Sequence, residues 1–129
     1  MLSARSAGIA GALFGALAVV LGAFGTHALR NTIGADAMST WRTAVDYQFW
    51  HALILVAAAA LGPGVWSGRT ARLAVLAYVV GIVLFSGSLF ALALGAPRML
   101  GAITPLGGVA LMAGWVLLAA ALVRTPARL

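Results

Sequence analysis

The stretch AGIAGALFGALAVVLGAFGTHAL, residues 7–29, decides the class of fold. It contains no acidic or basic side chain apart from one histidine, and it is longer than the about 20 apolar residues that a helix needs to cross a bilayer. It also exceeds the roughly 7–15 apolar residues of a secretory signal peptide. We therefore expect a membrane span rather than a cleaved leader.

Three more apolar stretches follow, separated by turn-forming residues such as Gly62-Pro63-Gly64 and Gly95-Ala96-Pro97. In lipid, a spanning segment must satisfy its own backbone hydrogen bonds, which favours helices. The sequence predicts an all-α, polytopic membrane protein, a four-transmembrane-helix bundle that forms a single domain over residues 1–129. The predicted spans are about 7–29, 43–62, 72–95 and 101–123.

The composition supports the same class. Hydrophobic residues make up 64% of the chain and charged residues 8%, and the mean hydropathy is +1.10. Soluble domains have about 45–50% apolar and about 25% charged residues. So few charged side chains cannot cover a surface that faces water, and the lipid bilayer is the expected surrounding.

The net charge of +6 comes from arginines that flank the apolar stretches, which points to membrane topology and not to a nucleic-acid partner. The side that holds both termini carries more arginines than the opposite side, so the positive-inside rule predicts cytoplasmic termini. The side of the two termini holds Arg5, Arg69, Arg72, Arg124 and Arg128, and the opposite side holds Arg30, Arg42 and Arg98. The chain has no cysteine, which excludes disulfides and thiol chemistry.

Polar side chains inside the predicted spans gather in the outer half of the membrane. Ionisable residues at such depth usually face protein or water and are candidates for function. One outward-opening pocket explains the pattern, and a hydrogen-bonded network that only holds helices together explains it as well. The pocket candidates are His27, Tyr47, Gln48, His51, Ser86, Ser88 and Thr104.

Small residues recur every three or four positions in the first and third spans. This spacing lets helix backbones approach closely. In the first span, the face that carries these small residues and the face that carries His27 point in different directions. They are therefore expected to meet different partners, and the sequence predicts a homo-oligomer or a larger membrane complex. The expected helix-packing glycines are Gly11, Gly15, Gly22, Gly25, Gly81, Gly107 and Gly108.

Five segments together resemble the proteins of domain-of-unknown-function family 423: GAFGTHAL (22–29), WRTAVDYQFWHALIL (41–55), LFSGSLFALAL (84–94), LGAITPLGG (100–108) and AGW (113–115). The resemblance implies four transmembrane helices in the bacterial inner membrane, and it implies no reaction. The patterned positions include Gly87, Pro105 and Trp115 beside the pocket candidates. Trp50 and Phe90 stand where tyrosine is common in the family.

Several functions stay open. The first is a binding or accessory protein whose pocket takes a small or lipid-like ligand such as a quinone, a lipid or a metal. The second is a structural or assembly subunit without a ligand, and a small transporter is the third. His27 and His51 are the only metal candidates, too few for zinc, and their different depths disfavour haem, so the sequence requires no cofactor. No nucleophile–base set or phosphate loop indicates an enzyme.

Overall fold

The computed structural model describes residues 2–125, so Arg128, which entered the charge count, lies outside the described residues. The described chain is all-helical, as predicted, and consists of long helices joined by short turns. The elements in order are α1 (Ala4–Phe24), the π-helix η1 (Gly25–Leu29), α2 (Ala35–Ala59), α3 (Pro63–Trp66), α4 (Arg69–Ala93), the 3-10 helix η2 (Arg98–Ala102) and α5 (Ile103–Val123).

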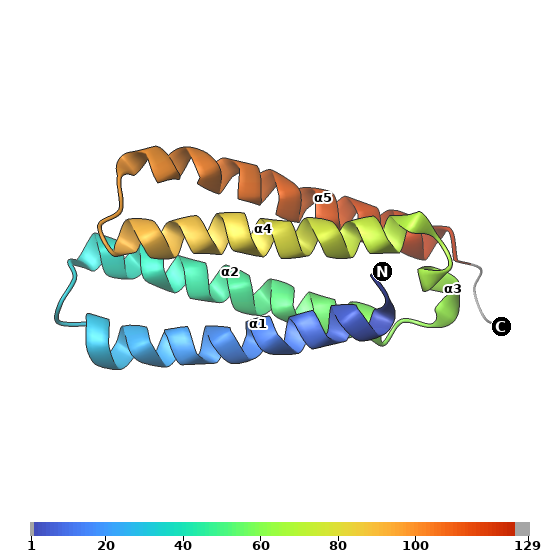
Figure 1. The fold of residues 1–129 in the computed structure, drawn as a ribbon, viewed down its shortest axis with the longest axis horizontal. Helices are drawn as coiled ribbons and strands as arrows, with labels where there is room; N and C mark the ends of the chain where they lie inside the picture. The colour runs from blue at the N-terminus through green and yellow to red at the C-terminus, as the bar shows by residue number, and fades with distance from the viewer. Residues whose placement is uncertain (1, 126–129) are drawn as a thin grey trace.

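The long helices lie side by side in the order α1, α2, α4, α5 (Figure 1). Each one packs along its neighbour in the chain, whereas α1 and α5 share no extensive contact within residues 2–125. The long helices therefore form an open row with α2 and α4 at its centre. The start of α1, α3 and the end of α5 lie at one end of the molecule, and the α1–α2 and α4–α5 turns lie at the other (Figure 1).

Local chemistry explains where the helices begin and end. Ser3 caps α1 and forms a capping box with Ser6, whose backbone N–H it accepts at 3.2 Å. Gly95 adopts a positive φ of 90°, which favours glycine, and so ends the turn after α4. The predicted break at Gly62-Pro63-Gly64 is present, but it also starts the one-turn helix α3, which the sequence pattern did not predict.

The π-helix η1 forms where α1 meets a tryptophan of α2. The Trp41 indole N–H donates to the carbonyl oxygen of Leu21 at 2.9 Å. The same ring lies so close to Gly25 that a methyl group placed there would be 2.5 Å from its nitrogen. Single π-turns often arise where a side chain disturbs the α-helical ladder. The result is that His27 sits on a widened turn at the end of α1.

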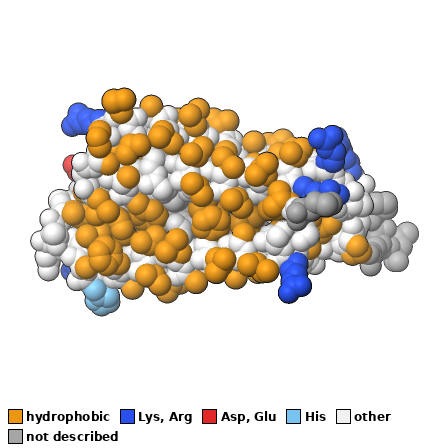
Figure 2. Space-filling model, in the orientation of Figure 1, with side chains coloured by type: hydrophobic (Ala, Val, Ile, Leu, Met, Phe, Trp, Pro, Cys, Tyr) orange, Lys and Arg blue, Asp and Glu red, His pale blue; other side chains and the backbone are white. Residues whose placement is uncertain are grey.

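Within residues 2–125, three helical stretches are long and apolar enough to cross a membrane: Ala4–Leu29, Arg69–Ala93 and Arg98–Val123. Helix α2 has the same length as α4, but it carries Arg42, Asp46, Gln48 and His51, which lower its hydropathy. Apolar side chains cover the middle of the visible face, and charged side chains occur only towards its two ends (Figure 2). This distribution is typical of a chain whose flanks face lipid.

Candidate functional site

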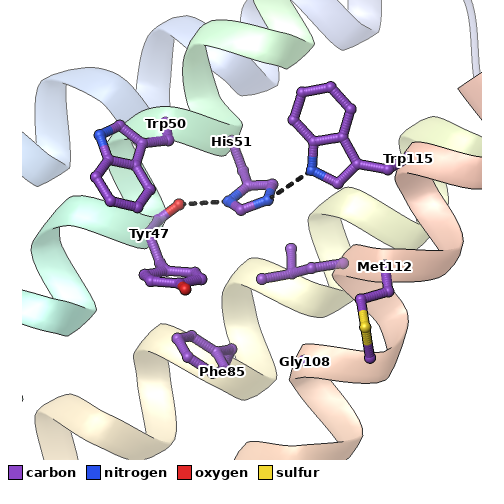
Figure 3. Close-up of a pocket in the computed structure, with 8 residues that line it drawn as sticks. Tyr47, Trp50, His51, Phe85, Gly108, Met112 and Trp115 are labelled. Carbon is purple, nitrogen blue, oxygen red and sulfur yellow. Dashed lines mark hydrogen bonds between the residues drawn. The ribbon is translucent and has the colours of Figure 1, made fainter.

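The site is centred on His51, which is 5% exposed and lies between α2, α4 and α5. Its Nε2 atom is 3.3 Å from the indole nitrogen of Trp115 on α5. Because the indole N–H can only donate, Nε2 must accept. The proton therefore belongs to Nδ1, which lies 2.7 Å from the carbonyl oxygen of Tyr47. The two bonds together define the tautomer of the ring and its orientation (Figure 3).

Aromatic rings surround this histidine on three helices. Tyr47 stacks on it with the ring centres 6.0 Å apart, and Tyr78 of α4 lies 5.7 Å from it. Trp115 meets the edge of Tyr78 at 5.9 Å and 89°, and Phe85 packs 4.7 Å from Tyr47. Tilted and edge-on pairs of this kind are the favoured arrangements of aromatic rings. They make the wall around His51 apolar and well defined.

Beside this cluster lies a cleft of about 410 Å³ between α2 and α5, with α4 behind it. Trp50 is 54% exposed and Trp115 48% exposed, so both rings stand at the open side of the cleft. The volume lies within the range of about 300–1,000 Å³ that is usual for small-molecule sites. The lining residues are Tyr47, Trp50, His51, Phe85, Gly108, Leu111, Met112 and Trp115, most of which Figure 3 labels.

The cleft offers few polar atoms. Both ring nitrogens of His51 already have partners. The hydroxyl of Tyr47, which is half-buried, bonds no other group within residues 2–125. A ligand of this cleft therefore meets a mostly apolar surface. The Tyr47 hydroxyl and the indole N–H of Trp50 are the hydrogen-bonding side-chain groups of the lining that bond no other group in residues 2–125.

The structure brings only Tyr47 and His51 of the predicted pocket residues to this cleft. Gln48 points the other way and donates to the carbonyl oxygen of Phe14 on α1 at 2.9 Å. Ser88 and Thr104 bond each other at 2.7 Å between α4 and α5. The polar candidates therefore do not form one network, because α2 lies between α1 and α4 and its polar residues meet different neighbours.

Two further candidates lie apart from the cleft lining. Ser86 is buried, and its hydroxyl has no hydrogen-bond partner in the described part of the chain. His27 is exposed on η1. Residues 2–125 contain no group of three or more His, Cys, Asp or Glu side chains that could hold a metal ion.

The predicted packing glycines lie between helices of the same chain. A methyl group on Gly11 would lie 2.7 Å from the carbonyl oxygen of Ala52 on α2, whereas one on Gly15 would keep an ordinary 3.8 Å from the Ala52 Cβ. Between α4 and α5, Gly81 faces Leu111 and Gly107 faces the backbone of Phe85. Gly22 and Gly25 face Val45 and Trp41 of α2, and Gly108 lines the cleft beside Phe85.

The sequence interpretation missed most of the cleft lining. Phe85, Met112 and Trp115 stand in apolar stretches, where large side chains are expected to face lipid. Trp115 belonged to the family pattern without an assigned role. The one signal for Trp115 was that the family pattern contains a tryptophan, whose indole N–H can donate a hydrogen bond, at this position. Its partner His51 lies 64 residues earlier in the chain, so the sequence did not indicate the pair.

The protein is a small helical membrane protein with a candidate site among its helices. Its helices are apolar, hydrophobic side chains cover the middle of the face in Figure 2, and a cleft lies between α2 and α5. The family model described as "Protein of unknown function (DUF423)" matches residues 21–108. The chain belongs to this family. No solved structure matches it.

Its relatives are named as membrane proteins. The UPF0382 membrane protein YwdK of Bacillus subtilis is 44% identical over 119 residues, which cover 90% of this chain and 94% of YwdK. A UPF0382 membrane protein of Staphylococcus saprophyticus is 44% identical over 113 residues, or 85% of this chain and 90% of the relative. The UPF0382 inner membrane protein YgdD of Escherichia coli is 40% identical over 119 residues, or 88% and 86% of the two chains.

Proposed function

We propose that the cleft between α2 and α5 binds a membrane-dissolved amphiphile, such as a quinone or another lipid with a compact head. The carrying observation is the cleft of about 410 Å³ whose lining is aromatic and aliphatic, with His51, the Tyr47 hydroxyl and two indole N–H groups as its polar side-chain groups. An apolar body fits the rings, and one polar group of the ligand meets Tyr47. Ligand sites of this kind combine an apolar wall with a few placed polar groups.

A metal ion is a weaker candidate for this cleft. His51 is the single imidazole in the lining, and both of its nitrogens are engaged. A metal would have to displace Trp115 and would find no second nitrogen or carboxylate ligand among the lining residues. An amphiphile needs no second nitrogen or carboxylate ligand, and for this reason we prefer it to a metal ion.

We propose in addition that α2 crosses the membrane as a fourth span. Its buried polar groups have partners on other helices: Gln48 bonds Phe14 of α1, and His51 bonds Trp115 of α5. Partners of this kind reduce the cost of holding polar groups in lipid. Both termini then lie in the cytoplasm, and the membrane is the bacterial inner membrane, in line with the name of the Escherichia coli relative.

A second role, association with another copy or with a larger complex, is favoured by the open row of helices. The outer face of α1 carries a shallow apolar groove of about 280 Å³ formed by Ala10, Leu13, Phe14 and Leu17. A neighbouring helix that packed there would bury this face.

The mass of the protein in lipid nanodiscs tests this role, since a value for one chain per disc at every loading ratio would exclude self-association.

The cleft proposal is tested with two matched glycine substitutions. Gly108 lines the cleft, and its added Cβ would meet only ordinary contacts with Phe85 at 3.8 Å, so Gly108→Leu is expected to fill the cleft without unfolding the protein. Gly87 has nothing within 4 Å of an added Cβ, so Gly87→Leu is the control. Mass spectrometry of gently solubilised protein should show a retained lipid or quinone in wild type and Gly87→Leu, and little in Gly108→Leu. Equal retention by the two variants would exclude the cleft as the site.

A further inference from the structure

The hydrogen bond between His51 and Trp115 is the longer of the two that hold the imidazole. Its N···N distance is 3.3 Å, whereas the Nδ1 atom is 2.7 Å from the Tyr47 carbonyl oxygen. Typical N–H···O bonds are about 2.9–3.0 Å long. Trp115 is 48% exposed and lines the cleft at its open side. The indole therefore makes a long bond from a position that has room to rotate outward.

If the indole leaves, His51 keeps its orientation. The bond from Nδ1 to the Tyr47 carbonyl lies within α2 itself and does not involve Trp115. Nε2 then remains an unprotonated acceptor, because the single ring proton is on Nδ1. His51 is itself part of the cleft lining, and Figure 3 shows the Trp115 nitrogen directed at it from across the cleft.

We infer that the Trp115 N–H occupies the acceptor that the ligand uses, and that the head of the ligand carries a hydrogen-bond donor. This inference rests on the proposed function of the cleft. On binding, a hydroxyl or N–H of the amphiphile replaces the indole at His51 Nε2. The favoured ligand class is an alcohol, a phenol or a hydroquinone, rather than an ether, an ester or an oxidised quinone.

The discrimination comes from His51 and not from Tyr47. A phenolic hydroxyl can donate as well as accept, so Tyr47 can bond a ligand of either kind. The Nε2 atom in this tautomer can only accept. A ligand without a donor must either leave Trp115 in place or leave a buried acceptor without a partner, and sites of this kind reject analogues that lack the donor.

The experiment compares a bromine-substituted alkylphenol with the methyl ether of the same molecule, which has the same shape but no donor. The protein is held in nanodiscs, and the bromine quenches the emission of tryptophans that it touches, with Trp50 and Trp115 in the cleft. The mole fraction of each compound in the lipid that gives half of the maximal quenching is the measure of its affinity. It is corrected for the partition of the compound into discs without protein. In wild type the phenol gives up the indole bond when it binds, so we expect it to bind at most about threefold more tightly than the ether. Where the indole N–H is absent, the preference should rise to about threefold to tenfold, the range given by one net hydrogen bond.

Two variants separate the acceptor from its competitor. Trp115→Phe keeps an aromatic wall and removes the competing N–H, so it should tighten phenol binding and increase the preference over the ether, with Trp50 as the reporter. His51→Phe removes the acceptor, so it should bind both molecules equally.

The outcomes distinguish the inference from the proposed function. Saturable binding of both molecules with equal strength in wild type and in Trp115→Phe would overturn the inference and leave the cleft as a site for amphiphiles. Saturable quenching by neither molecule would overturn both. Since Trp115 is half-exposed, a folding defect in His51→Phe would still leave the Trp115→Phe comparison to decide.

Discussion

The side-chain amide of Gln48 donates to the main-chain carbonyl of Phe14, 2.9 Å away on α1 and 34 residues earlier in the chain. Gln48 is 3% exposed, so this bond is made in the interior between the two helices. Two residues away, Trp50 faces the open side of the cleft. Helix α2 therefore presents a polar group to α1 on one side and an aromatic site to α5 on the other.

Removal of this amide is expected to destabilise the α1–α2 pair. Gln48→Leu loses the bond to Phe14 and should lower the free energy of unfolding by about 0.6–2 kcal/mol, the range for hydrogen bonds between membrane helices. Phe49→Leu, one residue away at a more exposed position, is the control and should change stability little. Denaturant unfolding in mixed micelles measures both. Equal effects would mean that the bond to Phe14 contributes nothing to stability.

The close approach of α1 and α2 at Gly11 gives a second prediction. Gly11→Leu places a side chain against the carbonyl oxygen of Ala52, where even a methyl group would lie at 2.7 Å. We expect a loss of several kcal/mol or a failure to fold, because overpacking in a close contact costs about 1–3 kcal/mol or more. Gly15→Leu should have a smaller effect, since its added Cβ would have 3.8 Å of room.

Val20 supplies the control for this series. Its side chain is 62% exposed on the lipid side of α1, so Val20→Leu should leave the melting temperature unchanged within about 1 °C, as surface substitutions usually do. The expected order of damage is Gly11, then Gly15, then Val20. A different order would mean that α1 packs on α2 through another face.

The sequence was sufficient to predict the helical class, the breaks between helices and the family. These properties depend on local composition: apolar stretches of membrane length, Gly-Pro turns, and arginines at the ends of helices. The sequence also predicts a span at about 43–62, although Asp46, Gln48 and His51 lower the hydropathy of this stretch. The crossing that we propose for α2 depends on the bonds of Gln48 and His51 to α1 and α5, which hydropathy does not include.

The candidate site could be predicted only in part. Gln48 and His51 are three residues apart, about 60° around the helix, and the sequence predicts both as residues of one pocket. In the structure that angle is enough to direct Gln48 to α1 and His51 towards α4 and α5, since α2 lies inside the row. The contact of His51 with Trp115 depends on how α5 returns along α4, and no local pattern contains that information.

A buried hydroxyl without a partner gives the third prediction. Tyr78 is 0% exposed, and its oxygen has no hydrogen-bond partner in the described chain. An unsatisfied buried polar group carries a penalty of about 1–3 kcal/mol. Tyr78→Phe keeps the ring against His51 and Trp115 and removes this penalty, so it should raise the free energy of unfolding by about 1 kcal/mol.

Tyr47→Phe is the matched control for Tyr78, because Tyr47 lines the cleft and its hydroxyl bonds no other group in residues 2–125. It should leave stability unchanged while it weakens the binding of an amphiphile to the cleft. Calorimetry or denaturant titration of the two variants in the same detergent makes the comparison. If Tyr78→Phe destabilised the protein as much as Gln48→Leu, the Tyr78 hydroxyl would have to bond a group such as a buried water.

The last prediction concerns the crossing of α2 and the side on which the termini lie. The chain has no cysteine, so a single introduced thiol reports its own position. Gly34 precedes α2 and has nothing within 4 Å of an added Cβ, and Gly68 precedes α4 with its nearest neighbour at 3.9 Å. Both positions should therefore accept cysteine without a change in fold.

A membrane-impermeant maleimide added to the periplasmic side should modify Gly34→Cys and leave Gly68→Cys unmodified until the membrane is permeabilised. This result follows from the proposed topology, in which Arg5, Arg69, Arg72 and Arg124 keep the α3 end in the cytoplasm. In that topology α2 crosses the membrane with Gln48 and His51 bonded to α1 and α5. Labelling of Gly68→Cys alone would invert the topology. Labelling of both positions from one side would mean that α2 does not cross, so that only α1, α4 and α5 span the membrane.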